Sequence, residues 1–179
     1  MEGKALLFKH FAGVDSVPII LDVHTADEIV AVVKAIAPSF GAINLEDIAA
    51  PRCFEVEERL KAELDIPVFH DDQHGTAVVV LAGIINAMKV VGKELADCKI
   101  VTIGAGAAGT AIMKLLHLYG VGSLLAVDSK GILSADRSDL NDDKKALLPY
   151  LDTSVSGSLD DAISGADIFI GVSKPGLLT

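Results

Sequence analysis

The stretch KIVTIGAGAAG, residues 99–109, decides the fold, because an apolar strand in it runs directly into a glycine-rich turn. The next residues, TAIMKLLHLYG, have the apolar spacing of a helix that ends at Gly120. A strand, this turn and a helix in that order form the context that the GxGxxG dinucleotide fingerprint requires. Gly104 permits the tight turn, Gly106 lets the backbone approach a pyrophosphate, and Gly109 lets helix and strand pack closely. We therefore predict an α/β fold with a Rossmann-like parallel sheet.

The next apolar segment, SLLAVD, ends in Asp128, which lies 19 residues past Gly109. At this place in such a unit an acid can hydrogen-bond the adenosine ribose of NAD. Ser129 and Lys130 follow directly and could instead accept the 2′-phosphate of NADP, so the preference stays open. The alternative is a glycine-rich turn in another α/β fold. The candidate cofactor-binding residues are Gly104, Ala105, Gly106, Ala107, Ala108, Gly109 and Asp128.

Helical and strand patterns alternate along the whole chain, which implies βαβ units and a parallel sheet. Thr25 stands three residues before Glu28, a capping-box spacing that begins a helix. The polar connector GKELADC, residues 92–98, predicts two domains, 1–92 and 93–179. The predicted helices are 4–12, 27–37, 53–64, 75–91 and 110–119, the predicted strands are 17–23, 42–45, 66–69, 99–103 and 123–128, and a last helix and strand lie within 158–172.

The composition describes a globular protein, with 51% hydrophobic and 22% charged residues. A net charge of −10 argues against a nucleic-acid partner, which would need a basic face. No apolar run is long enough to span a membrane, and AVVVLAGIINAM, residues 77–88, is predicted to be a core helix. Cys53 and Cys98 are far apart in the sequence, and the N-terminus lacks a signal-peptide pattern, so we expect a cytoplasmic protein.

Two pairs of acids come directly after short apolar strands. Glu46 and Asp47 follow AINL, and Asp71 and Asp72 follow IPVFH. Because the carboxyl ends of parallel strands gather at one edge of a sheet, these acids are candidates for one shared site. Adjacent strand residues point to opposite faces, so a shared ligand requires the strand geometry to break at the acids. Carboxylates without cysteine suit Mg²⁺ or Mn²⁺ rather than zinc.

Each of these residues also has a plainer interpretation. Asp72 could cap a helix, and the first acid pair could be a solvated loop. His70 and His74 could be ligands or bases, but are more often structural. Lys4 could be one of many surface lysines. Arg52 could bind a carboxylate substrate or pair with Glu55.

Four segments together resemble malic enzymes of the compact bacterial type, in order and along essentially the whole chain. They are EGKALLFKHFAG (2–13), FGAINLEDIAAPRCFEVEERL (40–60), IPVFHDDQHGTA (66–77) and VTIGAGAAG (101–109). The resemblance implies oxidative decarboxylation of malate to pyruvate and CO₂ with NAD or NADP and a divalent cation, in a homodimer or larger homo-oligomer. It also implies that residues 1–92 are part of the catalytic domain and that 93–179 are an NAD(P)-binding Rossmann domain without its last strands.

The resemblance also implies a role for each acid and for one lysine. Glu46, Asp47 and Asp72 match the family's metal ligands. Lys4 matches the lysine that acts as general base, and Asp71 matches the acid beside it. The chemistry needs such a lysine, because C2 of malate loses its hydroxyl proton as it loses hydride. A lysine can take that proton only if its pKa is lowered or its own proton is shared with a neighbour.

The chain departs from the family pattern at both ends. Family members are longer, and the upstream YTPGVA-like motif, which carries the general-acid tyrosine, is absent. Tyr119 and Tyr150 stand in unrelated contexts. We therefore expect little malic enzyme activity from these 179 residues alone. The alternatives are a catalytically incomplete fragment that only binds cofactor or metal or packs against a partner, a malolactic enzyme, and another Rossmann dehydrogenase.

Overall fold

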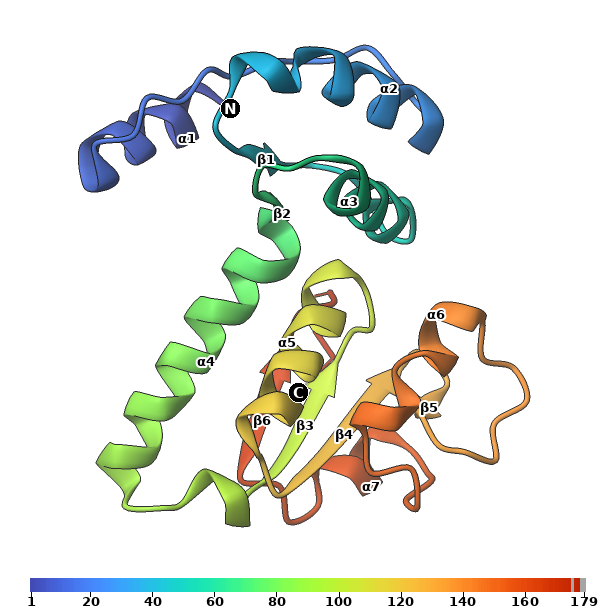
Figure 1. Ribbon diagram of the computed structural model, residues 1–179. Helices are drawn as coiled ribbons and strands as arrows, with labels where there is room; N and C mark the ends of the chain where they lie inside the picture. The colour runs from blue at the N-terminus through green and yellow to red at the C-terminus, as the bar shows by residue number, and fades with distance from the viewer. Residues whose placement is uncertain (175, 178–179) are drawn as a thin grey trace.

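The computed structural model describes residues 1–174 and 176–177, which form two sheets joined by one long helix (Figure 1). The helices are α1 (Glu2–Leu7), α2 (Ala26–Ile36), α3 (Arg52–Glu63), α4 (Asp71–Val91), α5 (Ala107–Tyr119), α6 (Asp142–Lys145) and α7 (Leu159–Ile163). The strands are β1 (Ile43–Leu45), β2 (Val68–His70), β3 (Lys99–Ile103), β4 (Ser123–Asp128), β5 (Gly131–Ile132) and β6 (Ile168–Gly171). A π-helical segment, η1 (Phe8–Ala12), continues α1, and short 3₁₀ turns are η2 (Ala37–Ser39), η3 (Leu95–Asp97) and η4 (Leu148–Tyr150).

The first part of the chain is built on two short parallel strands. β1 pairs with β2, with Leu45 opposite His70, and α3 connects the two strands. The predicted capping box is confirmed, because the Thr25 side chain accepts a hydrogen bond from the Glu28 N–H at the start of α2. The apolar faces of α2 and α3 meet the strands in one core of Ile29, Val30, Val33, Leu45, Val56, Leu60 and Val68.

The second part is a Rossmann-like unit, which confirms the predicted fold class. Its sheet has the order β5-β4-β3-β6, and β3 pairs in parallel with both β4 and β6. Successive residues of β3 point to opposite faces. Ile100 therefore packs under α5, whereas Val101 packs on the side that α7 covers. Both are fully buried, as expected for a parallel strand that is covered on both faces.

Three local features differ from the predictions. Residues 17–23 form no strand, because no neighbouring strand offers them a ladder; Leu21 and Val23 pack on the first core as irregular chain instead. α4 begins at Asp71, four residues before the predicted start. β5 adds a short antiparallel strand at the edge of the sheet.

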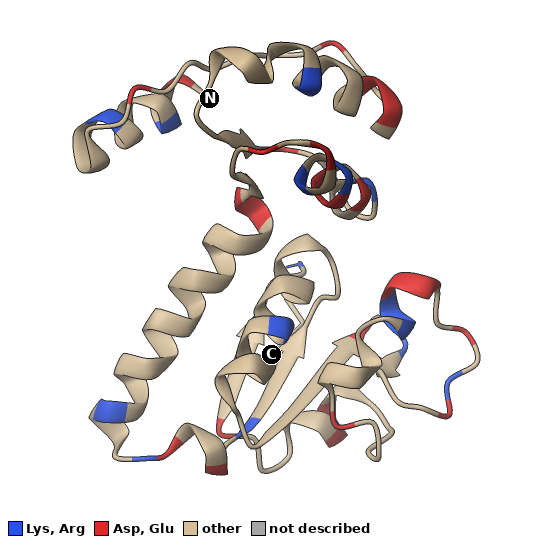
Figure 2. Ribbon diagram, viewed as in Figure 1, with Lys and Arg blue, Asp and Glu red and all other residues tan. Residues whose placement is uncertain are grey.

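Helix α4 runs from the β1–β2 sheet to the Rossmann-like unit, where it packs against α5 (Figure 1). Ala77 and Ile84 belong to the main core, but Val78, Val79 and Val90 are exposed. The prediction of a core helix is therefore right for one face only. Among the described helices, α4 is long and apolar enough to cross a membrane, although one such helix is weak evidence. The charged residues of α4 lie near its two ends (Figure 2). Between them, one face of α4 packs on the main core through Ala77 and Ile84.

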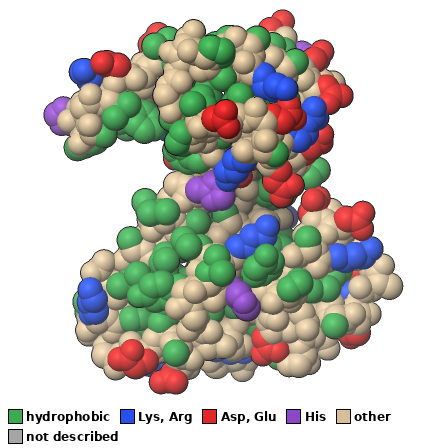
Figure 3. Space-filling view, viewed as in Figure 1, with side chains coloured by type: hydrophobic (Ala, Val, Ile, Leu, Met, Phe, Trp, Pro, Cys, Tyr) green, Lys and Arg blue, Asp and Glu red, His purple; other side chains and the backbone are tan. Residues whose placement is uncertain are grey.

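Apolar side chains gather on the face that α4 and α5 form and under α1 (Figure 3). Leu6, Leu7 and Phe11 on the first helical arm are each more than half exposed. The chain packs α4 against the second unit although α4 lies before the predicted boundary at residues 92 and 93. That boundary stays a prediction.

Leu116 on α5 tests the packing of the main core. Its side chain is 1% exposed, so Leu116→Ala should lower the free energy of unfolding, by about 2–5 kcal/mol. Leu118, two residues further along the same helix, is 77% exposed and supplies the matched control. Leu118→Ala should change the free energy by less than about 0.5 kcal/mol. Urea denaturation of both variants measures the difference, and equal effects would contradict the described core.

Candidate active site

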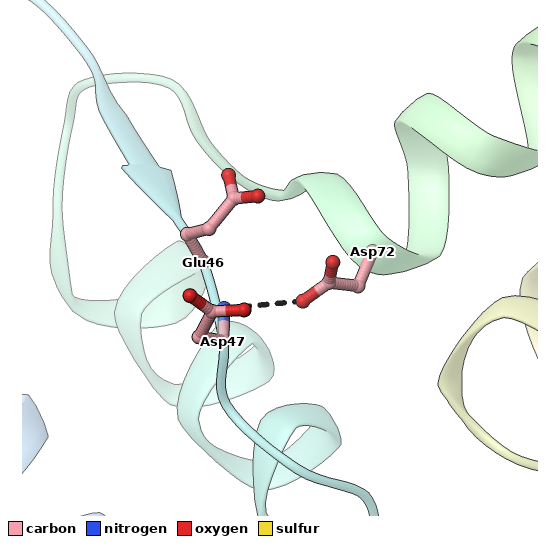
Figure 4. A group of neighbouring side chains, drawn as sticks. All are labelled: Glu46, Asp47 and Asp72. Carbon is pink, nitrogen blue, oxygen red and sulfur yellow. Dashed lines mark hydrogen bonds between the residues drawn. The ribbon is translucent and has the colours of Figure 1, made fainter. Parts of the chain in front are cut away.

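Three carboxylates from the ends of β1 and β2 meet at one point (Figure 4). Glu46, Asp47 and Asp72 each offer an oxygen, and these oxygens lie within 4.8 Å of one another. The backbone breaks where the shared site requires it, because Asp47 has a left-handed φ of 56° and Asp72 lies in the first turn of α4. The Asp47 N–H donates to Asp72 Oδ2 at 3.1 Å. The structure thus brings together the three acids that the family resemblance implies as metal ligands, and their role stays a prediction.

Lys4 reaches this cluster from α1. Its Nζ donates to Glu46 Oε2 and, at 2.5 Å, to Asp71 Oδ2. Burial disfavours the charged ammonium, but the contacts with Asp71 and Glu46 outweigh it and raise the pKa of Lys4 above its usual value. Lys4 is therefore held as a cation between two anions, and its plainer interpretation as one of many surface lysines is wrong.

The N-terminus of helix α4 favours the two acids with which the helix begins. Asp71 and Asp72 occupy its first turn, where unpaired N–H groups and the helix dipole favour negative charge. The side chain of Asp71 lies over Gly75, one turn along. A Cβ at Gly75 would stand 2.2 Å from Asp71 Oδ1, so this rotamer of Asp71 requires glycine there.

A cavity of about 590 Å³ opens beside the cluster. Its walls are mainly apolar residues of the segment 14–21, α2 and β1. Lys4, Asn44, Glu46 and Asp47 contribute polar groups to it. An apolar cavity with a few convergent charged groups is the usual form of a small-molecule site.

The glycine turn forms the junction between β3 and α5. Gly104 has a φ of 109°, and a Cβ at Gly109 would stand 1.8 Å from the Gly104 carbonyl oxygen, so both positions require glycine. Nothing lies within 4 Å of a Cβ at Gly106, the N-cap of α5, which leaves open space above the turn. The first N–H groups of a helix lack intrahelical partners and are free to bind an anion. The turn has the features of a pyrophosphate site.

Asp128 lies at the end of β4, but it does not stand alone. Arg137 donates to both of its carboxylate oxygens at 2.9 and 3.2 Å, and Lys144 lies 2.5 Å from Oδ2. Burial opposes ionisation of Asp128, but the hydrogen bonds from Arg137 and Lys144 outweigh it and lower the pKa to about 2. No local pattern in the sequence indicates these two cations, because Arg137 lies in the polar segment after β5 and Lys144 lies in the short helix α6. The role of Asp128 at the ribose stays a prediction.

The other polar residues near the cluster differ in whether they have hydrogen-bond partners. His70 is fully buried, and its Nε2 lies 3.5 Å from Asp72 Oδ2, but neither ring nitrogen makes a hydrogen bond within the described residues. His74 bonds to Glu57. Arg52 donates to the His24 carbonyl oxygen and not to Glu55. Glu57, whose carboxylate is buried beside the start of α4, was missed; its only sequence signal is an acid on the apolar face of a helix.

The residues present fit both a divalent cation and a dinucleotide, the two groups that the family resemblance implies. The carboxylate cluster offers hard oxygen ligands with more negative charge than Lys4 neutralises, which suits Mg²⁺ or Mn²⁺. The glycine turn and the start of α5 suit the pyrophosphate of a dinucleotide. Tyr119 is exposed near the end of α5 and Tyr150 packs edge-on against His117, so both belong to the other unit.

The Rossmann-like unit and the acid cluster define a dinucleotide-binding α/β protein with a candidate metal site. The sequence matches the family described as malic enzyme, NAD binding domain, over residues 73–176, and the malic enzyme N-terminal domain over residues 24–61. The chain belongs to the malic enzyme family.

Individual relatives agree with this assignment. The chain is 59% identical to an NAD-dependent malic enzyme of Geobacillus stearothermophilus, covering 99% of itself and 37% of that protein. It is 49% identical to an NADP-dependent malic enzyme of Halomonas elongata, covering 100% of itself and 42% of that protein. The crystal structure of an NAD-dependent malic enzyme from Thermotoga maritima is similar, with a TM-score of 0.94 at 48% identity over 99% of this chain and 48% of that one. The chain thus spans less than half the length of these relatives.

Gly75 tests the placement of Asp71. Gly75→Ala should displace the Asp71 carboxylate and break its contact with Lys4, because the new Cβ would occupy its position. Since that contact raises the pKa of Lys4, its loss should lower this pKa. The measurement is the rate of Lys4 labelling by an amine-reactive reagent against pH, followed by peptide mass spectrometry.

The matched control is Gly83→Ala in the same helix, where a Cβ meets nothing within 4 Å. It should leave the Lys4 titration unchanged and stabilise the helix by up to about 1 kcal/mol. An identical Lys4 titration in the two variants would show that Gly75 does not place Asp71.

Proposed function

We propose that this chain is the metal- and cofactor-binding part of an enzyme that oxidises and decarboxylates malate to pyruvate and CO₂ with NAD or NADP. The observation that carries the proposal is the convergence of Lys4, Asp71 and the three acids Glu46, Asp47 and Asp72. The names of the relatives, which are NAD- and NADP-dependent malic enzymes, support the cofactor and the substrate. The glycine turn supports the placement of the dinucleotide.

Lys4 and Asp71 are suited to move the proton of the C2 hydroxyl. The ammonium has a raised pKa, so Lys4 cannot act as a base unless it first gives up a proton. Asp71 Oδ2 is 2.5 Å from Nζ, close enough to share that proton. The neutral amine can then take the hydroxyl proton as hydride leaves C2. This supports proton sharing with Asp71 over a lowered lysine pKa.

Glu46, Asp47 and Asp72 would hold the divalent cation. Bound there, the cation would polarise the C2 oxygen and stabilise the negative charge that decarboxylation leaves on it. Glu46 Oε2 is also a partner of Lys4, so one of the acids that would hold the cation also favours the charged form of the lysine. Glu46 would therefore take part in both steps of the proposed reaction.

The proposal predicts that malate-dependent reduction of NAD or NADP by the protein purified from its source requires Mn²⁺ or Mg²⁺. Asp72→Asn should lower the affinity for Mn²⁺ by more than about 100-fold, the upper end of what loss of a supporting residue costs a metal site. Turnover is measured from nicotinamide absorbance and pyruvate formation, and Mn²⁺ affinity from the electron paramagnetic resonance of the free ion. Lactate in place of pyruvate would identify the malolactic reaction.

Asp22→Asn supplies the control, because this fully exposed acid carries the same charge and lies on the loop before α2. It should bind Mn²⁺ as the unchanged protein does. Turnover that persists after removal of divalent cations, or that survives Asp72→Asn, would refute the metal-dependent mechanism. Mn²⁺ binding without turnover would favour the alternative of an incomplete module.

We also propose that Lys144 favours a 2′-phosphate at the predicted ribose site. Among the described residues, three cations, Lys130, Arg137 and Lys144, pair there with two acids, Asp128 and Asp139. Lys144→Gln should weaken NADPH binding more than NADH binding, because a dianionic phosphate gains most from the ammonium. Lys145→Gln removes an exposed neighbouring charge and should change neither affinity. Fluorescence titration measures both, and equal loss for both nucleotides would contradict the proposal.

We propose a cytoplasmic homodimer or larger homo-oligomer that does not act on a membrane or on nucleic acid. The two cysteines are buried and free, which suits a reducing compartment. A net charge of −10 is unfavourable for binding to nucleic acid.

A further inference from the structure

Glu57 on α3 is a buried carboxylate that the proposed reaction does not use. The residue is 5% exposed, and its two oxygens are surrounded by donors. The His70 N–H donates to Oε1 at 3.0 Å, and Gln73 Nε2 lies 3.3 Å from Oε2. His74 Nε2 lies 2.8 Å from Oε1 and 2.9 Å from Oε2. Lys61, one turn along α3, approaches Oε1 at 2.9 Å.

These contacts hold Glu57 as an anion. Burial opposes its ionisation, but His74 and Lys61 outweigh burial and lower the pKa of Glu57 below its usual value. A buried carboxylate without such partners is strongly unfavourable. Glu57 therefore stays charged only while its donors are in place. Removing the carboxylate leaves the donors without their partner, and removing the donors destabilises the carboxylate.

The position of Glu57 links the two acid pairs. α3 follows Glu46 and Asp47 after only a short turn, and α4 begins with Asp71 and Asp72. Three of the donors to Glu57 come from His70, Gln73 and His74, the residues on either side of the second acid pair. A helix start that is tied at several points to one carboxylate cannot rotate about its own axis.

We propose that Glu57 is a positioning residue for the divalent-cation site. By holding the first turn of α4 at a fixed rotation, it keeps Asp72 facing Glu46 and Asp47. The inference rests on the proposed function, because it assumes that the three acids bind a cation. It adds a residue that touches neither cation nor substrate but sets the geometry of the ligands.

The test is Mn²⁺ binding to the purified full chain, measured by electron paramagnetic resonance without substrate or cofactor. Glu57→Gln keeps the shape of the side chain but removes the charge that binds His74 and Lys61. We expect the dissociation constant for Mn²⁺ to rise about 10-fold or more, as for other residues that support metal ligands. Glu55→Gln, on the same helix with an exposed side chain paired to Arg59, makes the same charge change and should leave the constant within about twofold, as expected for a screened surface charge.

His74→Ala separates positioning from general loss of structure. The His74 side chain is 44% exposed, so its removal should be tolerated and should weaken Mn²⁺ binding less than Glu57→Gln does. The double variant should bind no more weakly than Glu57→Gln alone, because both substitutions remove the same contact. Thermal unfolding shows whether each variant is folded; if Glu57→Gln is not folded, weakened Mn²⁺ binding by His74→Ala supports the proposal.

Mn²⁺ binding by Glu57→Gln equal to that of Glu55→Gln would overturn the positioning role and leave the proposed metal site intact. Unchanged Mn²⁺ binding by His74→Ala would do the same if Glu57→Gln is not folded. Additive losses in the double variant would overturn it as well, since His74 would then act independently of Glu57. No Mn²⁺ binding by the unchanged chain would overturn both the metal site and this inference.

Discussion

The close approach of carboxylates at the ends of β1 and β2 is the constraint on which the rest of the structure depends. Glu46, Asp47 and Asp72 present oxygens within 4.8 Å of one another, and Asp71 lies beside them. Like charges at this distance repel unless cations or N–H groups face them. Lys4 and the start of α4 supply part of that compensation, which leaves a net negative pocket suited to a divalent cation.

Helix α4 connects the acid cluster to the second unit. Its first turn holds two of the acids, and further along the same helix Ala77 and Ile84 enter the core beneath α5. α5 in turn begins at the glycine turn. Because a packed helix bends little, the acid cluster and the predicted pyrophosphate site are tied together through α4 and α5. This link gives a physical reason for one chain to combine a metal site and a dinucleotide site.

Much of the site could be predicted because its signals are local. The glycine turn follows a strand and opens a helix, and both acid pairs end apolar strands, so sequence order alone brought them to expected places. Residues 17–23 were predicted wrongly, because a strand needs a neighbour as well as an apolar pattern. The partners of Asp128 were missed for a related reason: Arg137 lies in a loop and Lys144 in the short helix α6, and no local pattern specifies where either comes to lie.

The sequence by itself determined which groups the chain carries: the GAGAAG turn, the four acids after two strands, and the capping box of α2. Short-range sterics and hydrogen bonding decide these features, so they can be read within a few residues. The tertiary structure alone decided which charges meet. Lys4 pairs with Glu46 and Asp71, and Glu57 binds the start of α4, across 42, 67 and 13 or more residues of chain. Such contacts depend on how helices pack around a shared core, which no local pattern specifies.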